Sequence, residues 1–220
     1  MKAPLNAGLT AAVVACLVGG PAPAAAQAAH TGGNSKTVYV AHLHPMNTKV
    51  TGHATTGDAR FSIEGDNLTI SIKVKGAAPD IEHWQHFHGF TDSRDATCPT
   101  KSADKNGDGI IDLIETEPAA GTTMVPFDSD PAAMDVAHGA YPKASAGGTY
   151  DYHQVVSLEA LKAAFAKAFD GAQLDLDRRV VFVHGVPSDT KLASSVASLG
   201  PIPAQVTLPI ACGTIERAKR

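Results

Sequence analysis

Histidines gather in one short stretch of the chain, at His83, His86 and His88, with aromatic residues between them. If the stretch is a β-strand, its two-residue period places His86 and His88 on one face and Phe87 on the other. Two imidazoles side by side on a strand form half of a transition-metal site. Such pairs also occur on surfaces and in hydrogen-bonded cores, so the metal reading needs a second source of ligands. A valine-rich run that ends at His184 is the best candidate for that source.

Other histidines are candidates for a fourth ligand. His153 is the best of them, because it lies in a run with the pattern of a strand. His83 and His138 are further candidates. His42 and His44 share one face of the first expected strand, near the start of the mature chain, and we interpret them as structural or exposed.

A second metal motif occupies residues 104–115. It satisfies in full the twelve-residue pattern of a calcium loop, in which oxygens surround a hard cation and Gly109 allows a sharp turn. The expected ligands are Asp104, Asn106, Asp108, the carbonyl of Ile110, Asp112 through water, and Glu115 with two oxygens. The alternative is an ordinary surface turn rich in Asp, Asn and Gly. Because no clear helices flank the loop, we predict one structural calcium site and not a paired sensor.

The first residues have the pattern of a secretory signal peptide. Lys2 precedes an apolar run at residues 7–18 and a small-residue run at 22–26, which is too short for a membrane-spanning helix. We expect a signal peptide at residues 1–26, a linker at 27–36, and export to the periplasm or the outside. The alternative is a lipoprotein anchored through Cys16. Soluble export is preferred because apolar residues continue past that cysteine.

The remaining chain of about 190 residues is long enough for one domain with a sizeable core. The full chain has 18 basic and 22 acidic residues and no basic stripe, which argues against a nucleic-acid partner. Only Cys98 and Cys212 remain after cleavage, and two cysteines in an exported protein most simply form one disulfide. The oligomeric state stays open.

Short runs of alternating apolar and polar residues predict the elements that position these groups. The expected strands cover residues 37–44, 52–63, 68–74, 83–90, 149–156, 179–186 and 204–215. Ser157 caps one helix, whose apolar residues recur at helical spacing from Leu158 to Phe169 before Gly171 ends it. The meander of short strands in the first half predicts an all-β domain, either a sandwich or a barrel.

Three short stretches, in this order, resemble copper/zinc superoxide dismutases. They are His86 to Phe90 followed by Cys98, residues 181–184, and residues 210–215 around Cys212. In that family the His-x-His strand and the later valine-rich strand supply copper ligands, and the two cysteines tie the active-site loop to the last strand. The resemblance covers most of residues 38–215. It implies a Greek-key β-sandwich or barrel at residues 37–216. The residue patterns add one inserted helix and the EF-hand-like loop to that fold.

The resemblance also implies which residues hold copper. His86, His88 and His184 would be its ligands and the catalytic residues, with His153 as the fourth ligand. Copper would cycle between two oxidation states, taking an electron from one superoxide and giving it to the next. The implied small ligand is therefore superoxide or the metal ion itself.

The chain departs from the dismutases after Cys98. The family carries a bridging histidine and zinc ligands there, whereas this chain has the calcium-like loop and no histidine before His138. Pro209 stands where the family has a substrate-guiding arginine. The strand pattern also resembles secreted chordin-type (CHRD) domains with a calcium-like loop. Two functions are therefore expected: an exported copper-binding protein that resembles the dismutases, either dismutating superoxide or with catalysis lost, or a non-catalytic CHRD-like module stabilised by calcium and a disulfide.

Overall fold

The protein folds as an all-β domain, as predicted. The computed structural model describes residues 36–92 and 94–219, within a compact unit that spans Asn34–Arg220. The expected signal peptide at 1–26, the lipidation alternative at Cys16 and all but the last residue of the linker lie outside the described residues. No helix in the described part of the chain is long and apolar enough to cross a membrane.

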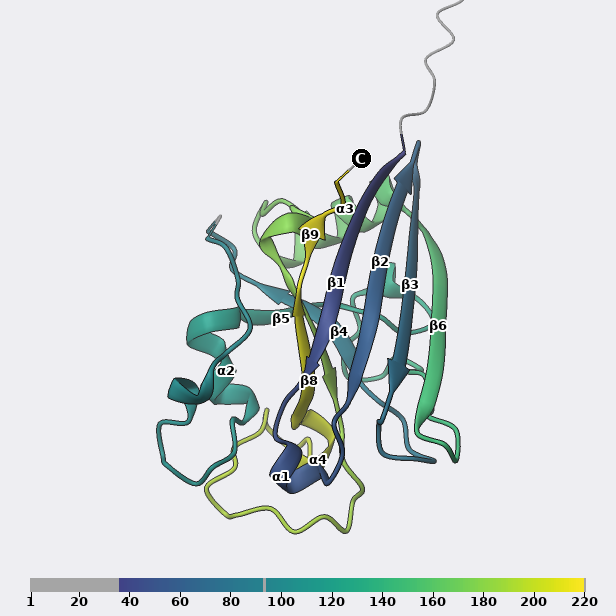
Figure 1. The fold of residues 1–220 in the computed structure, drawn as a ribbon. Coiled ribbons are helices and arrows are strands. Elements are labelled where there is room, and N and C mark those ends of the chain that lie inside the picture. The colour runs from purple at the N-terminus through teal and green to yellow at the C-terminus, as the bar shows by residue number, and fades with distance from the viewer. Residues whose placement is uncertain (1–35, 93, 220) are drawn as a thin grey trace, which may run out of the picture. The chain divides into compact units, whose positions relative to one another are not determined.

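Antiparallel strands make up the domain (Figure 1). Over the described residues they are β1 (Thr37–Pro45), β2 (Thr56–Glu64), β3 (Asn67–Lys75), β4 (Gln85–Gly89), β5 (Thr122–Pro126), β6 (Thr149–Ser157), β7 (Val180–His184), β8 (Pro209–Thr214) and β9 (Glu216–Arg217). Their spatial order is β5-β4-β7-β8-β1-β2-β3-β6, with β9 beside β1.

The sheet has two halves that meet at the end of β1. The long strands β1, β2, β3 and β6 lie side by side in one half (Figure 1), and β5, β4, β7 and β8 form the other. The end of β1 joins them, because His44 lies opposite Cys212 of β8. After β4 and β5 have formed in the second half, β6 returns to lie beside β3, which is the crossing connection of a Greek key.

Alternation of side chains explains the first half. Along β3, the residues Leu68, Ile70, Ile72 and Val74 are at most 1% exposed, and they pack with Phe61 of β2 in the main core. Strands β4 and β7 are buried on both faces. One face joins this core, and the other is covered by the connection between β4 and β5. A strand that is covered on both sides loses the alternating pattern and reads as a continuous apolar run.

Four helices occur in the described residues: α1 (Thr48–Thr51), α2 (Leu113–Ala120), α3 (Leu158–Ala168) and α4 (Ala204–Thr207). Short 3-10 turns occupy Lys101–Ala103, Pro131–Ala133 and Leu176–Arg178. The expected inserted helix is α3, and the Ser157 hydroxyl accepts a hydrogen bond from the Ala160 amide as its cap. The expectation of a strand from residue 204 was wrong at its start, because α4 occupies 204–207 and β8 begins at Pro209.

Helix α2 contradicts the expectation that no helix flanks the calcium-like loop. Asp112 begins it with a capping box: its carboxylate accepts from the Glu115 amide at 3.0 Å, and the Glu115 carboxylate accepts from the Asp112 amide at 3.2 Å. The helix has only eight residues and contains Pro118, so its sequence shows little helical periodicity of apolar residues. Strand β5, directly after it, was also missed.

A disulfide ties the connection between β4 and β5 to β8. Cys98 and Cys212 are bonded, with 5.8 Å between their Cα atoms and a sequence separation of 114. The predicted pairing is therefore confirmed. The side chain of Asn47 adds a second tie, because its amide group donates to the carbonyls of Ile111 and Pro209 at 2.8 and 2.9 Å.

Candidate metal centre

Three buried histidines converge on the covered face of the second half-sheet. His86 and His88 project from β4, His184 ends β7, and each is at most 3% exposed. One nitrogen of each ring lies within 4.8 Å of the others. The ring centres are 5.0 Å apart for His86 and His184, and 5.7 Å apart for the other two pairs. The two-residue period of β4 and its pairing with β7 produce this convergence.

His184 is held in one orientation by the backbone around it. A register shift at Val183 and His184 interrupts the pairing of β7 with β8. The His184 amide donates to the Trp84 carbonyl at 2.8 Å, and ring atom Nδ1 donates to the Thr207 carbonyl at 2.8 Å. Because a carbonyl only accepts, Nδ1 carries the proton, and Nε2 is left with a free lone pair.

The other ring nitrogens have few partners. His88 Nε2 shares a hydrogen bond with the Thr123 hydroxyl at 3.2 Å, and neither nitrogen of His86 has a partner. Among the described residues, the buried side-chain atoms without a hydrogen bond are His86 Nδ1, His86 Nε2, His88 Nδ1 and His184 Nε2. Burying such atoms unpaired is costly, and native proteins avoid it. A metal ion would satisfy three of these nitrogens at once, so the donor set fits one.

Burial also keeps the three rings neutral. It lowers the pKa of His86 and His88 well below the usual range, and the neighbouring histidines lower both further. Burial lowers the pKa of His184 to about 4, although the hydrogen bond to Thr207 opposes this. Neutral imidazole is the form that binds metals, so the site is ready for a cation at neutral pH.

His83 is not a ligand, because both of its ring nitrogens contact backbone carbonyls. Its Nδ1 contacts the His184 carbonyl and its Nε2 contacts the Ala78 carbonyl, both at 2.9 Å. The ring is fully buried and stacks on Tyr150, with centres 5.8 Å apart. Both nitrogens are thus occupied, and His83 holds the end of β7 in place beside the three-histidine cluster.

His153 does not join the cluster, and its prediction as fourth ligand was wrong. It lies on the exposed face of β6, where Nδ1 contacts the Ser71 hydroxyl at 3.0 Å. Strand β6 pairs with β3 in the other half of the sheet, and His153 lies on the outer surface of the domain. His138 is also exposed and bonds Asp135. His42 and His44 are exposed, as expected.

Two aromatic rings cover the cluster on the His86 side. Trp84 and Tyr141 stack with centres 5.3 Å apart, and each forms a T-shaped contact with His86, with centres 6.3 and 5.8 Å apart. The Tyr141 hydroxyl donates to the Val136 carbonyl at 2.9 Å. Burial raises the pKa of Tyr141 above its usual value, and the charge of Asp128 adds to this. Tyr141 lies in the irregular connection between β5 and β6, where the sequence pattern gave no signal for it.

A small cavity opens beside His88. Its volume is about 60 Å³, enough for one or two water-sized groups. It is lined by His88, Leu113, Ile114, Glu117, Gly121, Thr122, Thr123 and Leu199. Ile114 and Leu199 stand at its rim, 42% and 45% exposed. The opening thus lies between α2 and the connection from β7 to β8.

No protein-family model matches the chain, and no curated protein matches it. The resemblance to dismutases and to chordin-type domains therefore rests on the short sequence stretches alone.

The calcium-like loop closes on its own side chains. The Asp104 carboxylate accepts from the amides of Gly107 and Gly109 at 2.8 and 2.9 Å. Glu115 reaches back to accept from the Lys105 amide at 2.8 Å. The loop carboxylates are less tightly gathered than the histidines, which form the only group of three ligand residues found within 4.8 Å in the described chain.

The remaining predicted ligands of the loop are also placed. The Asn106 and Asp108 side chains accept from the amides of Asp108 and Ile110, at 2.9 and 2.8 Å. Asp112 is 2% exposed, and its two oxygens accept from the amides of Glu115 and Ala197. Its carboxylate therefore serves the helix cap and the neighbouring connection, which leaves little of it for a water-mediated ligand.

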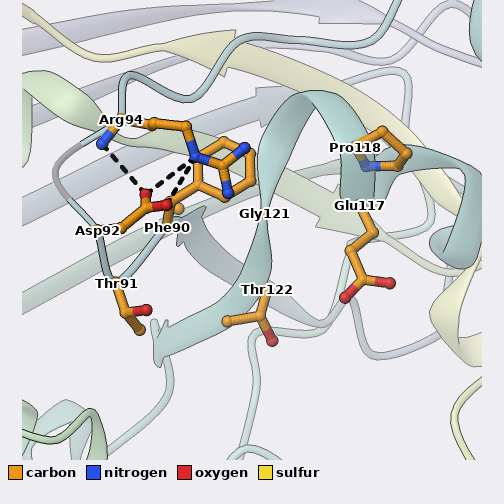
Figure 2. Close-up of a pocket in the computed structure, with 9 residues that line it drawn as sticks. Phe90, Thr91, Asp92, Arg94, Glu117, Pro118, Gly121 and Thr122 are labelled. Carbon is orange, nitrogen blue, oxygen red and sulfur yellow. Dashed lines mark hydrogen bonds and ion pairs between the residues drawn. The ribbon is translucent and has the colours of Figure 1, made fainter.

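A wider pocket lies beside the end of α2, and no histidine lines it (Figure 2). Its volume is about 380 Å³. Arg94 pairs with Asp92 at 2.9 Å and lies 4.0 Å over the Phe90 ring, so its guanidinium is already engaged. Glu117 lines this pocket as well as the opening at His88. The pocket lacks a set of groups for acid–base or metal chemistry.

Proposed function

We propose that the chain is an exported protein that binds one copper ion through His86, His88 and His184. The observation that supports this is the convergence of three buried, neutral imidazoles whose facing nitrogens have no hydrogen-bond partner. Leaving buried nitrogens unpaired is costly, and a bound metal ion would satisfy three of them. The Cys98–Cys212 disulfide supports export, because disulfides persist in oxidising compartments.

Copper is favoured over other metals by the chemistry of the donors. Imidazole suits copper, zinc, iron and nickel, and divalent copper binds most tightly among the first-row divalent ions. The described cluster contains no carboxylate, which disfavours calcium, magnesium and manganese. The resemblance to dismutases points to the same ion. When bound, copper would supply one-electron redox chemistry.

Superoxide dismutation is the second candidate function, and we expect it to be slow. The opening at His88 is wide enough for a diatomic anion, but Glu117 lies among its lining residues and no lysine or arginine does. Pro209, where the resembled enzymes have arginine, is buried in β8. A negative side chain at the entrance repels superoxide and lowers its rate of arrival. A non-catalytic module that stores copper fits these features better.

We also propose calcium as a structural ligand of residues 104–115. The complete twelve-residue pattern supports it, and so does the capped helix that follows directly. Calcium there would stabilise the connection that covers the histidines.

Metal analysis of protein purified from the periplasm tests the copper proposal. We expect about one copper per chain, with nitrogen hyperfine structure in the paramagnetic resonance spectrum. His86→Ala and His184→Ala should abolish uptake, whereas His153→Ala, which removes an exposed histidine, should not. Copper titration without spectral change in the wild type, or uptake that survives His184→Ala, would refute the site. Copper uptake without turnover would refute only the dismutase candidate.

A further inference from the structure

Three consecutive residues of the connection between β7 and β8 touch three parts of the site. The Ala197 amide donates to the Asp112 carboxylate at 2.6 Å. The Ser198 hydroxyl lies 2.8 Å from the Thr207 hydroxyl. Leu199 stands at the rim of the opening beside His88. Residues 197–199 therefore link the calcium-like loop, the backbone near His184 and the entrance to the metal site.

The direction of each hydrogen bond follows from the donors available. Ser198 donates its single hydroxyl proton to the Ile202 carbonyl at 2.6 Å, so the Thr207 hydroxyl must donate to Ser198. Thr207 is 4% exposed, and its carbonyl accepts from His184 Nδ1. A short polar path thus runs from Asp112 through residues 197 and 198 to Thr207 and the His184 ring.

The same segment has other contacts as well, because Leu192 and Val196 pack against the main core. It runs between β7 and α4, past the calcium-like loop (Figure 1), and its rim residue Leu199 leaves 45% of its surface exposed. One further bond joins it to the loop, from the Ser195 hydroxyl to the Asp108 carboxylate. Both bonds end on a carboxylate and are charge-assisted, but the Asp112 bond is partly buried and the Asp108 bond is exposed, so solvent screens the Asp112 bond less.

We propose that residues 197–199 act as a latch over the three histidines, and that Asp112 and Ser198 are positioning residues that hold it closed. The proposal rests on the metal site proposed above, because the latch would govern how fast that metal enters and leaves. Asp112 fixes the segment, and Ser198 transmits this position to Thr207 and so to the orientation of His184. Release of the latch moves Leu199 from the rim and loosens the His184 ring.

Two variants break the latch while sparing the rest of the fold. Asp112→Asn removes the charge that holds Ala197, and asparagine remains a good helix cap for α2. Ser198→Ala removes the hydroxyl that accepts the hydrogen bond from the Thr207 hydroxyl. Ser195→Ala is the matched control, because it deletes the other bond between the same two segments and has no link to Thr207.

The experiment measures copper release from the loaded full chain to a strong chelator by stopped flow, together with the copper paramagnetic resonance spectrum. We expect Asp112→Asn to speed release at least about tenfold, since the loss of a hydrogen bond to a charged group corresponds to at least that factor. Ser198→Ala should speed release by a smaller factor, because the bonds of its hydroxyl, to the Ile202 carbonyl and the Thr207 hydroxyl, join neutral groups. Both variants should also shift the spectrum, because the His184 ring loses its fixed orientation. Ser195→Ala should leave rate and spectrum unchanged. Equal rates in all four proteins, or an equal acceleration by Ser195→Ala, would overturn the latch.

Metal-free protein gives an independent reading, so failure of the copper site and failure of the latch are distinguishable. Nitrogen-15 NMR should show the Ala197 amide protected from exchange and the His184 Nδ1 proton visible in the wild type. Asp112→Asn should remove the protection of the Ala197 amide from exchange. Both variants should broaden the signal of the His184 Nδ1 proton. Unchanged signals in both variants would refute the latch, whether or not the wild type binds copper.

Discussion

Acidification should destabilise the metal-free protein mainly through its three buried histidines. His184 has a pKa of about 4 in the folded protein, against about 6.5 in an unfolded chain. Below pH 6.5 the unfolded chain therefore takes up a proton that the folded protein excludes. Stability is fully present above pH 6.5 and falls as the pH drops towards 4.

The size of this effect follows from the same two pKa values. Their difference corresponds to about 3 kcal/mol for His184 alone, of which about 2 kcal/mol should be lost by pH 5. His86 and His88 act in the same direction, because burial lowers the pKa of both. The carboxylates with lowered pKa, such as Asp66 and Asp92, lose their contribution only at lower pH.

Urea denaturation at several pH values between 7.5 and about 4.5 would measure how the free energy of unfolding changes with pH. His184→Gln should reduce this pH dependence by the contribution of one histidine. His153→Gln, which removes an exposed histidine, should leave the pH dependence unchanged. Bound copper should be released over the same range, because protons and metal compete for the ring nitrogens. A free energy of unfolding that stays constant from pH 7 to pH 5 would refute the buried neutral cluster.

Three further predictions concern the disulfide, the calcium-like loop and the aromatic cover. Replacing Cys98 and Cys212 by alanine should lower the free energy of unfolding by about 4–5 kcal/mol, and a loss below 1 kcal/mol would contradict the loop-entropy estimate. Chelation should lower the melting temperature of the wild type but not of Glu115→Gln; equal melting of the wild type with calcium and with chelator would reduce the loop to a turn. Copper should quench the fluorescence of Trp84, the only tryptophan, and His86→Ala should prevent this; unaltered wild-type emission would count against a metal at this position.

The convergence of His86, His88 and His184 could be predicted because each signal was local. The two-residue period of a strand decides that His86 and His88 share a face. The valine-rich run before His184 is typical of a strand buried on both faces, and two such strands pair in the centre of a sheet. The resemblance supplied the pairing itself, which periodicity does not contain.

His153 shows where that reasoning ends. The pattern around it correctly predicted a strand, and β6 is that strand. A strand period says which residues share a face but not which neighbour the strand pairs with or which face is covered. Strand β6 pairs with β3 and turns His153 outwards. Tyr141 was missed for a related reason: it lies in an irregular connection, and only tertiary contacts bring it to His86.

The surroundings of the cluster separate the two candidate functions. On the His86 side, Trp84 and Tyr141 close the site, so no small molecule reaches the histidines there without moving a stacked pair. On the His88 side, the entrance is about 60 Å³ in volume, bordered by Leu199 and by the negative side chain of Glu117. Fast dismutation needs an open, positively charged path, because its rate is set by the arrival of an anion. Slow metal exchange needs only a covered site with a narrow exit. The contacts around these three histidines are those of the second kind, so copper retention is the function that they support best.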